Sequence, residues 1–140
     1  MIFPRTHRRR HYLSHREVAR NLIHERVAHF APQYGVTIRR IAIRNQKSRW
    51  GSCSRNGNLN FNYKVALLPP ELRDYIIVHE ICHLKEFNHG RGFWDLVAQV
   101  VPEHREMRKK LREIERAVAI KTIKIPPSFV GRLVRSLVGH

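Results

Sequence analysis

Apolar positions at helical spacing mark the first quarter of the chain. Residues 14–17, Ser-His-Arg-Glu, have the S-x-x-E form of a capping box, which is typical of a helix start. The apolar positions that follow at helical spacing are Val18, Ala19, Leu22, Ile23, Val27 and Phe30. This pattern predicts a helix from about residue 15 to residue 31, ended by Pro32 and Gly35.

The next stretches have the pattern of strands. Residues 36–44 are rich in β-branched side chains. Behind the turn signal Asn56-Gly57, the residues Leu59, Phe61 and Tyr63 alternate with asparagines, as they do in a strand with one buried face. We expect these stretches to form a small, mainly antiparallel sheet.

Helical patterns return in the second half of the chain. Pro70 and Glu71 suit the first turn of a helix that runs through His83, because proline tolerates that position and an acid complements the positive helix end. Two more helices are expected at about residues 93–100 and 102–115. The predicted class is α+β, with the small sheet packed on the helix that carries His83.

The patterns divide the chain into three parts. Residues 1–13 form a basic N-terminal segment, residues 14–116 a single folded domain, and residues 117–140 a basic, amphipathic tail. We expect the tail to dock on the protein's own surface, on a membrane surface or on a partner.

The composition agrees with one folded domain. The chain has 140 residues, of which 42% are apolar, and this excludes a disordered polar chain. The longest uncharged apolar run, at residues 65–70, is too short to cross a membrane, and the N-terminus lacks the apolar core of a secretory signal. We expect a cytoplasmic protein in which Cys53 and Cys82 are free thiols.

The positive charge gathers in two clusters. The formal net charge is +16, and its densest runs are Arg5, Arg8, Arg9 and Arg10 near the N-terminus and residues 105–112 in the last predicted helix. Such clusters form either a solvated face or a surface for non-specific contact with nucleic acid.

Residues 79–83, His-Glu-Ile-Cys-His, carry the clearest chemical signal. They form an H-E-x-x-H segment inside a predicted helix. Positions four apart on a helix differ by only about 40° in direction, so His79 and His83 can bind one metal ion. Glu80 lies one step around the helix, where it suits a general base acting on metal-bound water.

A third ligand is available at two places. The spacing of His79, His83 and His89 matches the H-E-x-x-H-x-x-G-x-x-H spacing of metzincin proteases, although Glu86 replaces the glycine at which their chain turns. Asn88 or Gly90 could supply that turn through left-handed or unrestricted backbone geometry. The competing ligand is Glu103, for which a helix-capping role is the ordinary explanation. We favour His89.

Several runs together resemble a known family. They are Arg-Asn-Gln-Lys-Ser-Arg-Trp-Gly-Ser-Cys at residues 44–53, Leu-Leu-Pro-Pro at 67–70, Asp-Tyr-Ile-Ile-Val-His-Glu-Ile-Cys-His-Leu at 74–84, Asn-His at 88–89 and Phe-Trp at 93–94. In this order and spacing they resemble the YgjP-like metallopeptidase domain over roughly residues 14–115. The two ends of the chain lie outside this resemblance.

The resemblance implies a minimal zincin fold related to the SprT and WLM proteases. It implies Zn²⁺ bound by His79, His83 and His89, with Glu80 as the catalytic acid and base. Arg49 and Trp50 are candidates for substrate binding, Arg49 by countering an oxyanion or a substrate carboxylate.

The expected reaction is hydrolysis of a peptide bond by zinc-activated water, with Glu80 moving the proton. An extended peptide or protein substrate could add beside an edge strand such as Leu59 to Tyr63. One alternative is a metal-dependent hydrolase of nucleoside triphosphates, whose phosphates basic residues would bind. Another is a DNA-associated module with a structural zinc, against which Glu80 speaks because a structural site is closed by four ligands and needs no base.

Overall fold

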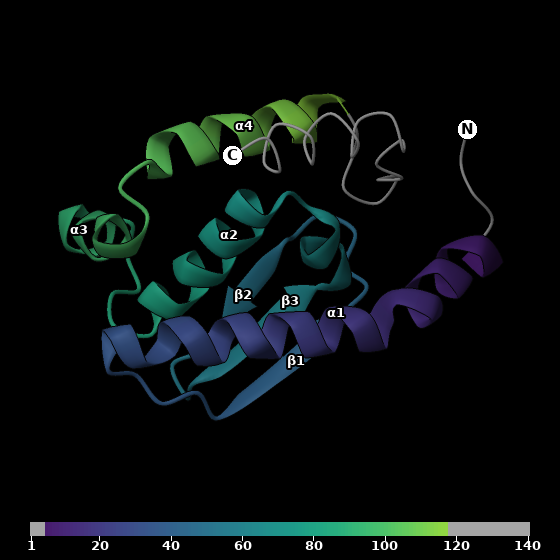
Figure 1. Ribbon diagram of the computed structural model, residues 1–140, viewed down its shortest axis with the longest axis horizontal. Helices are drawn as coiled ribbons and strands as arrows, with labels where there is room; N and C mark the ends of the chain where they lie inside the picture. The colour runs from purple at the N-terminus through teal and green to yellow at the C-terminus, as the bar shows by residue number, and fades with distance from the viewer. Residues whose placement is uncertain (1–4, 118–140) are drawn as a thin grey trace.

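The computed structural model describes residues 5–117 of the chain, which fold around a small sheet (Figure 1). In chain order the elements are α1 (Arg5–Tyr34), β1 (Arg40–Arg44), β2 (Gly51–Cys53), β3 (Asn58–Asn62), the 3-10 helix η1 (Tyr63–Leu67), α2 (Pro70–His83), α3 (Arg91–Val100) and α4 (His104–Ala117). The expected α+β class is confirmed. The predictions for the tail at residues 118–140 lie outside the described residues.

The first helix is longer than its sequence pattern predicts. Helix α1 begins at Arg5. Ser14 lies inside the helix and does not cap its start, since its hydroxyl donates to the backbone carbonyl of His11, 2.9 Å away. Tyr12 ties this early part to the sheet, since its hydroxyl donates to the carbonyl of Ile43 at 3.2 Å. The predicted start near residue 15 is therefore wrong.

The predicted end of that helix is nearly right. Helix α1 continues through Pro32 to Tyr34, and Gly35 then adopts a φ of 63°, the left-handed geometry that commonly ends helices. The amide of Gly35 donates to the carbonyl of Pro32 at 3.2 Å. Pro32 has no amide hydrogen to donate to the carbonyl of Ala28, so the last turn of α1 lacks one helical hydrogen bond.

The sheet is mixed, with the strand order β1-β3-β2, and not mainly antiparallel as predicted. Strands β2 and β3 are antiparallel because a tight turn joins them, in which Gly57 has a φ of 87°. Strand β1 pairs in parallel with the other edge of β3. The alternating pattern shows which side chains are buried but not in which direction a distant strand pairs.

The edge strand differs from the predicted one. Residues 59–62 lie in β3, the central strand, and Tyr63 begins η1. The open edges of the sheet belong to β1 and to β2, a three-residue strand that its sequence pattern did not indicate.

Helices α1 and α2 pack against each other and against the sheet, and α4 lies across α2 (Figure 1). Their shared core includes Ile23 from α1, Leu59 and Phe61 from β3, and Ile77 from α2, all with 0% exposure. Each such side chain stabilises the fold by about 1.5–3 kcal/mol through burial. This core fixes α2, and with it the histidines, over strand β2.

Two other expectations concern the whole chain. Helix α1 crosses the predicted boundary between residues 13 and 14 without a break. The division of the chain at residues 13 and 116 stays a prediction. Within residues 5–117, none of the helices has the length and apolar character needed to cross a membrane. Cys53 and Cys82 are free, as expected.

Candidate active site

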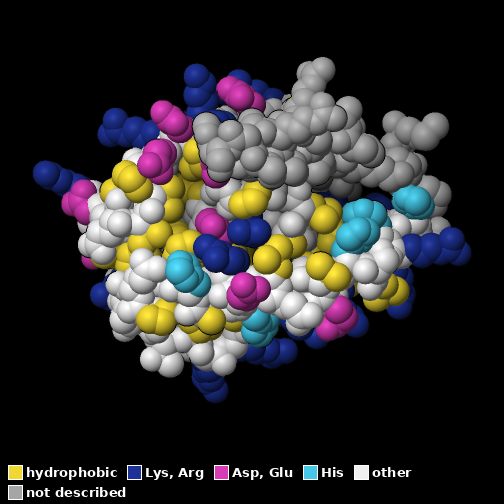
Figure 2. Space-filling view, viewed as in Figure 1, with side chains coloured by type: hydrophobic (Ala, Val, Ile, Leu, Met, Phe, Trp, Pro, Cys, Tyr) yellow, Lys and Arg dark blue, Asp and Glu magenta, His cyan; other side chains and the backbone are white. Residues whose placement is uncertain are grey.

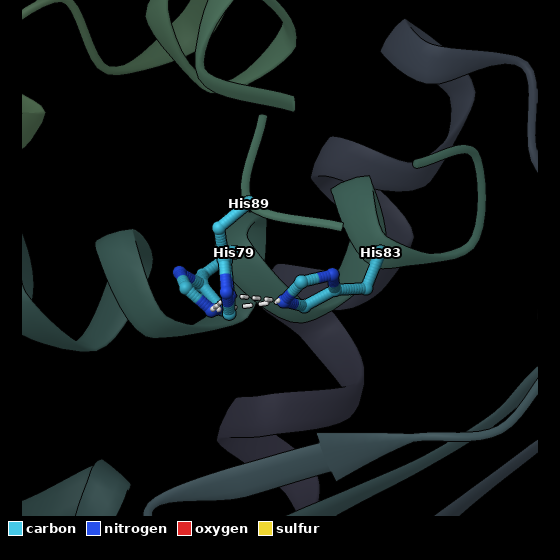
Figure 3. Close-up of side chains that lie close together, drawn as sticks. All are labelled: His79, His83 and His89. Atoms are coloured by element: carbon cyan, nitrogen blue, oxygen red, sulfur yellow. Dashed lines mark hydrogen bonds between the residues drawn. The ribbon is translucent and has the colours of Figure 1, made fainter. Parts of the chain in front are cut away.

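Helix α2 places two histidines on one face. Pro70 occupies its first turn and Glu71 complements its positive end, as the sequence indicates. His79 and His83 follow one turn apart, and Figure 3 shows that their rings point toward each other. Their Nε2 atoms lie 3.1 Å apart.

The loop between α2 and α3 brings His89 to the same point (Figure 3). Its Nε2 lies 2.8 Å from Nε2 of His83 and 3.3 Å from Nε2 of His79. Among the described residues 5–117, these three form the one group of histidine, cysteine or acidic side chains that could hold a metal ion.

The turn that returns His89 uses neither of the predicted devices. Among residues 5–117, positive φ occurs only at Gly35 and Gly57, so Asn88 and Gly90 are not left-handed. The chain leaves α2 through hydrogen bonds of the amides at residues 85 and 86 to the carbonyl of Cys82. Glu86 fits this turn because its φ is not positive, and no glycine is needed there.

The three nitrogens fit a metal ion. A neutral imidazole Nε2 either carries a hydrogen or offers a lone pair, so at least two of the three atoms are alike and repel each other at these distances. A cation at their centre removes that conflict. Three nitrogens around one tetrahedral zinc ion would lie about 3.3–3.4 Å apart, close to the observed spacing.

Surrounding groups favour the neutral forms of His79 and His83 and orient the ring of His83. Nδ1 of His83 donates to the carbonyl of Glu86 at 3.0 Å, which leaves its Nε2 lone pair facing the other rings. Burial lowers the pKa of His83. Burial, and then the neighbouring His83, His89 and Arg108, lowers the pKa of His79 to about 3. Neutral rings offer the lone pairs that a metal requires.

Glu80 lies on the cleft side of α2, against strand β2. It is 8% exposed, and burial raises its pKa to about 7. Its close approach depends on Gly51, where a Cβ atom would lie 3.1 Å from Cγ of Glu80 and 3.0 Å from the carbonyl oxygen of Asn60. Sequence reasoning missed this role of Gly51, because the sequence pattern did not indicate the strand that begins with it.

The three histidines and Glu80 open into a cleft of about 520 Å³. Its other lining residues are Arg49, Trp50, Gly51, Ser52, Cys53, Tyr75, Ile76, Phe87 and Leu111. Arg49 and Trp50 therefore lie at the cleft, as expected. Trp50 is nearly buried, and its Nε1 donates to a carboxylate oxygen of Glu115 at 2.7 Å, so it also ties the cleft wall to α4.

Glu103, the competing ligand, lies elsewhere. It lines a separate groove together with Phe30, Asp74 and Met107. The structure thus brings His89, and not Glu103, to the two histidines of α2. Cys82, between these histidines in sequence, is fully buried and does not line the cleft.

Fold and site together define a metal-dependent hydrolase with a histidine-lined cleft. The chain belongs to the YgjP-like family, since the sequence model of the YgjP-like metallopeptidase domain matches residues 4–114. The protein is therefore a metallopeptidase, an enzyme of the hydrolase class. The match starts before the predicted residue 14, so most of the arginine-rich start lies inside the family region and not outside it.

Solved structures agree with this assignment. The chain is similar to the crystal structure of the metallopeptidase zymogen of Pyrococcus abyssi abylysin, with 24% identity and a TM-score of 0.61 over 67% of this chain and 95% of that one. The corresponding zymogen of Methanocaldococcus jannaschii jannalysin shows 28% identity and a TM-score of 0.58 over 69% and 97%. No curated protein matches the chain.

Proposed function

We propose that the protein is a zinc peptidase in which His79, His83 and His89 hold the metal and Glu80 moves the proton. The observation that carries this proposal is the convergence of three Nε2 atoms within 3.3 Å of one another, in the cleft that Glu80 also lines. Three imidazoles with an open side are a typical catalytic zinc set, whereas a structural zinc has four protein ligands. This supports catalysis over a purely structural site.

When bound, zinc supplies Lewis acidity, which lowers the pKa of water and polarises a carbonyl group. The carboxylate of Glu80 accepts the proton of the attacking water and then donates it to the leaving amine. Burial of Glu80 favours both roles, because a pKa near 7 lets the side chain accept and release a proton at neutral pH.

Strand β2 is the edge beside which a peptide substrate would bind. Its residues Gly51, Ser52 and Cys53 line the cleft, and β3 pairs with its other side. A peptide that adds there gains backbone hydrogen bonds and lies beside Glu80. Arg49 precedes this strand and faces the same substrate, while Trp50 supports the strand through Glu115.

The test is the conservative substitution Glu80→Gln. The variant should retain one zinc per chain and lose at least about a hundredfold in peptide hydrolysis, since general-base catalysis contributes about 10²–10⁴-fold. Metal analysis and the rate on a mixed peptide library measure the two quantities. Glu103→Gln, the same change in the separate groove, is the matched control and should leave the rate unaltered.

Undiminished hydrolysis by Glu80→Gln would contradict the mechanism. Nucleoside triphosphates offered in parallel test the alternative. Hydrolysis of these compounds, but of no peptide, would replace the peptidase proposal with a phosphohydrolase.

A further inference from the structure

Arginine side chains stand around the cleft on both of its walls. Arg49 lines the cleft directly. The guanidinium carbon of Arg55 lies 5.0 Å from the ring centroid of Phe87, which also lines the cleft. These two arginines flank strand β2, one before and one after it.

Helix α4 supplies the arginines of the opposite wall. The guanidinium carbon of Arg108 lies 5.0 Å from the ring centroid of Trp94, and that ring stacks on His89 with 6.1 Å between centroids. Leu111 of the same helix lines the cleft, and Arg108 and Arg112 are its neighbours on α4, three residues before it and one residue after it. Both arginines are therefore within electrostatic range of the cleft.

The four arginines lack ionic partners among the described residues. Within residues 5–117, the ion pairs involve other cations: Arg26 and Arg73 pair with Asp74, Lys110 pairs with Glu71, and Arg16 and Arg20 pair with Glu17. Arg49, Arg55, Arg108 and Arg112 form none. Their charges are thus available to a ligand.

Few carboxylates offset this charge at the cleft. Among its described lining residues Glu80 is the one acid. Glu115 is close by through its hydrogen bond with Trp50, but it does not line the cleft. The cleft is therefore electropositive outside the catalytic carboxyl group.

The arginines are placed to contact a bound peptide along its length. Arg49 and Arg55 are six residues apart across β2, so at about 3.3 Å per residue they are separated by at most about 20 Å. A peptide extended beside β2 would present at most about six residues between them. Arg108 and Arg112 lie on α4, the helix whose Leu111 lines the cleft.

We propose that the cleft selects peptides with carboxylate side chains on both sides of the cleaved bond. The proposal rests on the proposed peptidase function and adds the substrate class. Stacking on Phe87 and Trp94 holds the guanidinium groups of Arg55 and Arg108 while their N–H groups remain free for a carboxylate.

The first experiment measures binding without cleavage. Full-length, zinc-loaded Glu80→Gln protein is titrated with three fluorescent decapeptides that carry Glu, Gln or Lys at the same flanking positions. The Glu peptide should bind about tenfold more tightly than the Gln peptide at low salt, since an exposed ion pair contributes up to about fivefold and at least two form. The Lys peptide should bind most weakly, and added salt should reduce the differences.

The second experiment removes the arginines. In the Glu80→Gln background, the double change Arg55→Gln and Arg108→Gln should reduce the preference for Glu over Gln to about twofold or less. The matched control is Arg40→Gln, an exposed arginine on β1 at the opposite edge of the sheet. It should keep the full preference.

The outcomes separate this inference from the proposed function. Equal binding of the three peptides, or a preference that survives the double change, overturns the inference. So does a nucleoside triphosphate that displaces the Glu peptide at lower concentration than the free Glu peptide does. Cleavage of the Gln peptide by the wild-type protein tests the peptidase function alone, because that peptide carries no selected charge.

Discussion

Two hollows lie near helix α4, and they differ in whether the charged side chains around them form ion pairs. The cleft that holds the histidines is bordered by arginines without ionic partners among the described residues. The second hollow, a groove of about 490 Å³, is lined by Glu71, Asp74, Glu103, Glu106 and Lys110 together with apolar side chains. Figure 2 shows one face of the molecule, in the orientation of Figure 1, on which acidic side chains border an apolar area.

The charges of the groove are largely used within the fold. Asp74 accepts two hydrogen bonds from Arg26, each 3.1 Å long, and a third from Arg73 at 3.0 Å. Lys110 lies 3.6 Å from Glu71 and thereby links α4 to α2. Paired charges in the groove thus join helices, whereas unpaired charges at the cleft remain for a substrate. We therefore expect substitutions in the groove to change mainly stability, and substitutions at the cleft to change mainly metal or substrate binding.

The largest expected effect is on zinc affinity and compares one residue from each hollow, His89 and Glu103. His89→Ala removes one of three converging nitrogens and should weaken zinc binding by at least about a hundredfold, because even residues that only orient metal ligands contribute about 10–100-fold. Glu103→Ala should leave zinc affinity unchanged, since Glu103 lines the groove. Competition with a chelator measures both affinities. The reverse result would move the metal site toward the groove.

The sequence predicts features that lie within one helix or strand better than contacts between residues far apart in the chain. His79 and His83 follow from the geometry of one helix, and the inward side of Leu59 and Phe61 follows from strand alternation. Both patterns are local, so both were predicted correctly. His89 was predicted from its spacing and from the family resemblance, and the structure shows a turn of a different kind from the one expected.

The features that were missed depend on contacts between distant residues. The approach of Glu80 to Gly51 joins a helix to a strand that its own pattern did not reveal. The stacking of Arg55 on Phe87 likewise joins the hairpin turn to the loop after α2. The pairing direction of β1 is set by the whole connection between β1 and β3. No local period encodes such contacts.

A second prediction breaks the paired charges of the groove. Asp74→Ala should lower the free energy of unfolding by about 1–3 kcal/mol, because it removes hydrogen bonds to two guanidinium groups that are partly buried. Zinc affinity should not change, since Asp74 does not line the cleft. Denaturant unfolding and chelator competition measure the two effects.

The matched control for this prediction is Glu17→Ala. Glu17 pairs with Arg16 and Arg20 on the exposed face of α1, where ion pairs contribute about 0.2–1 kcal/mol. Equal losses of stability from the two substitutions would contradict the structural role assigned to the groove. A loss of zinc binding in Asp74→Ala would contradict the separation of the two hollows.

The smallest predicted effect is a pH dependence of stability caused by Lys64, a buried charged residue outside both hollows. Lys64 in η1 is 4% exposed, and burial, followed by the charge of Arg8, lowers its pKa to about 8. An unfolded lysine has a pKa of about 10.4, so between pH 8 and pH 10 the unfolded chain binds more protons than the folded one. Stability from this group must therefore rise with pH.

From pH 8 to pH 9 the free energy of unfolding should rise by about 1 kcal/mol relative to Lys64→Met, since one pH unit is worth at most about 1.4 kcal/mol per proton. The difference between the two proteins is the quantity to measure, because burial raises the pKa of Cys53 and Cys82 to about 11 and both thiols oppose the trend as pH rises. Parallel pH profiles of the two proteins would show that burial does not disfavour the charged form of Lys64.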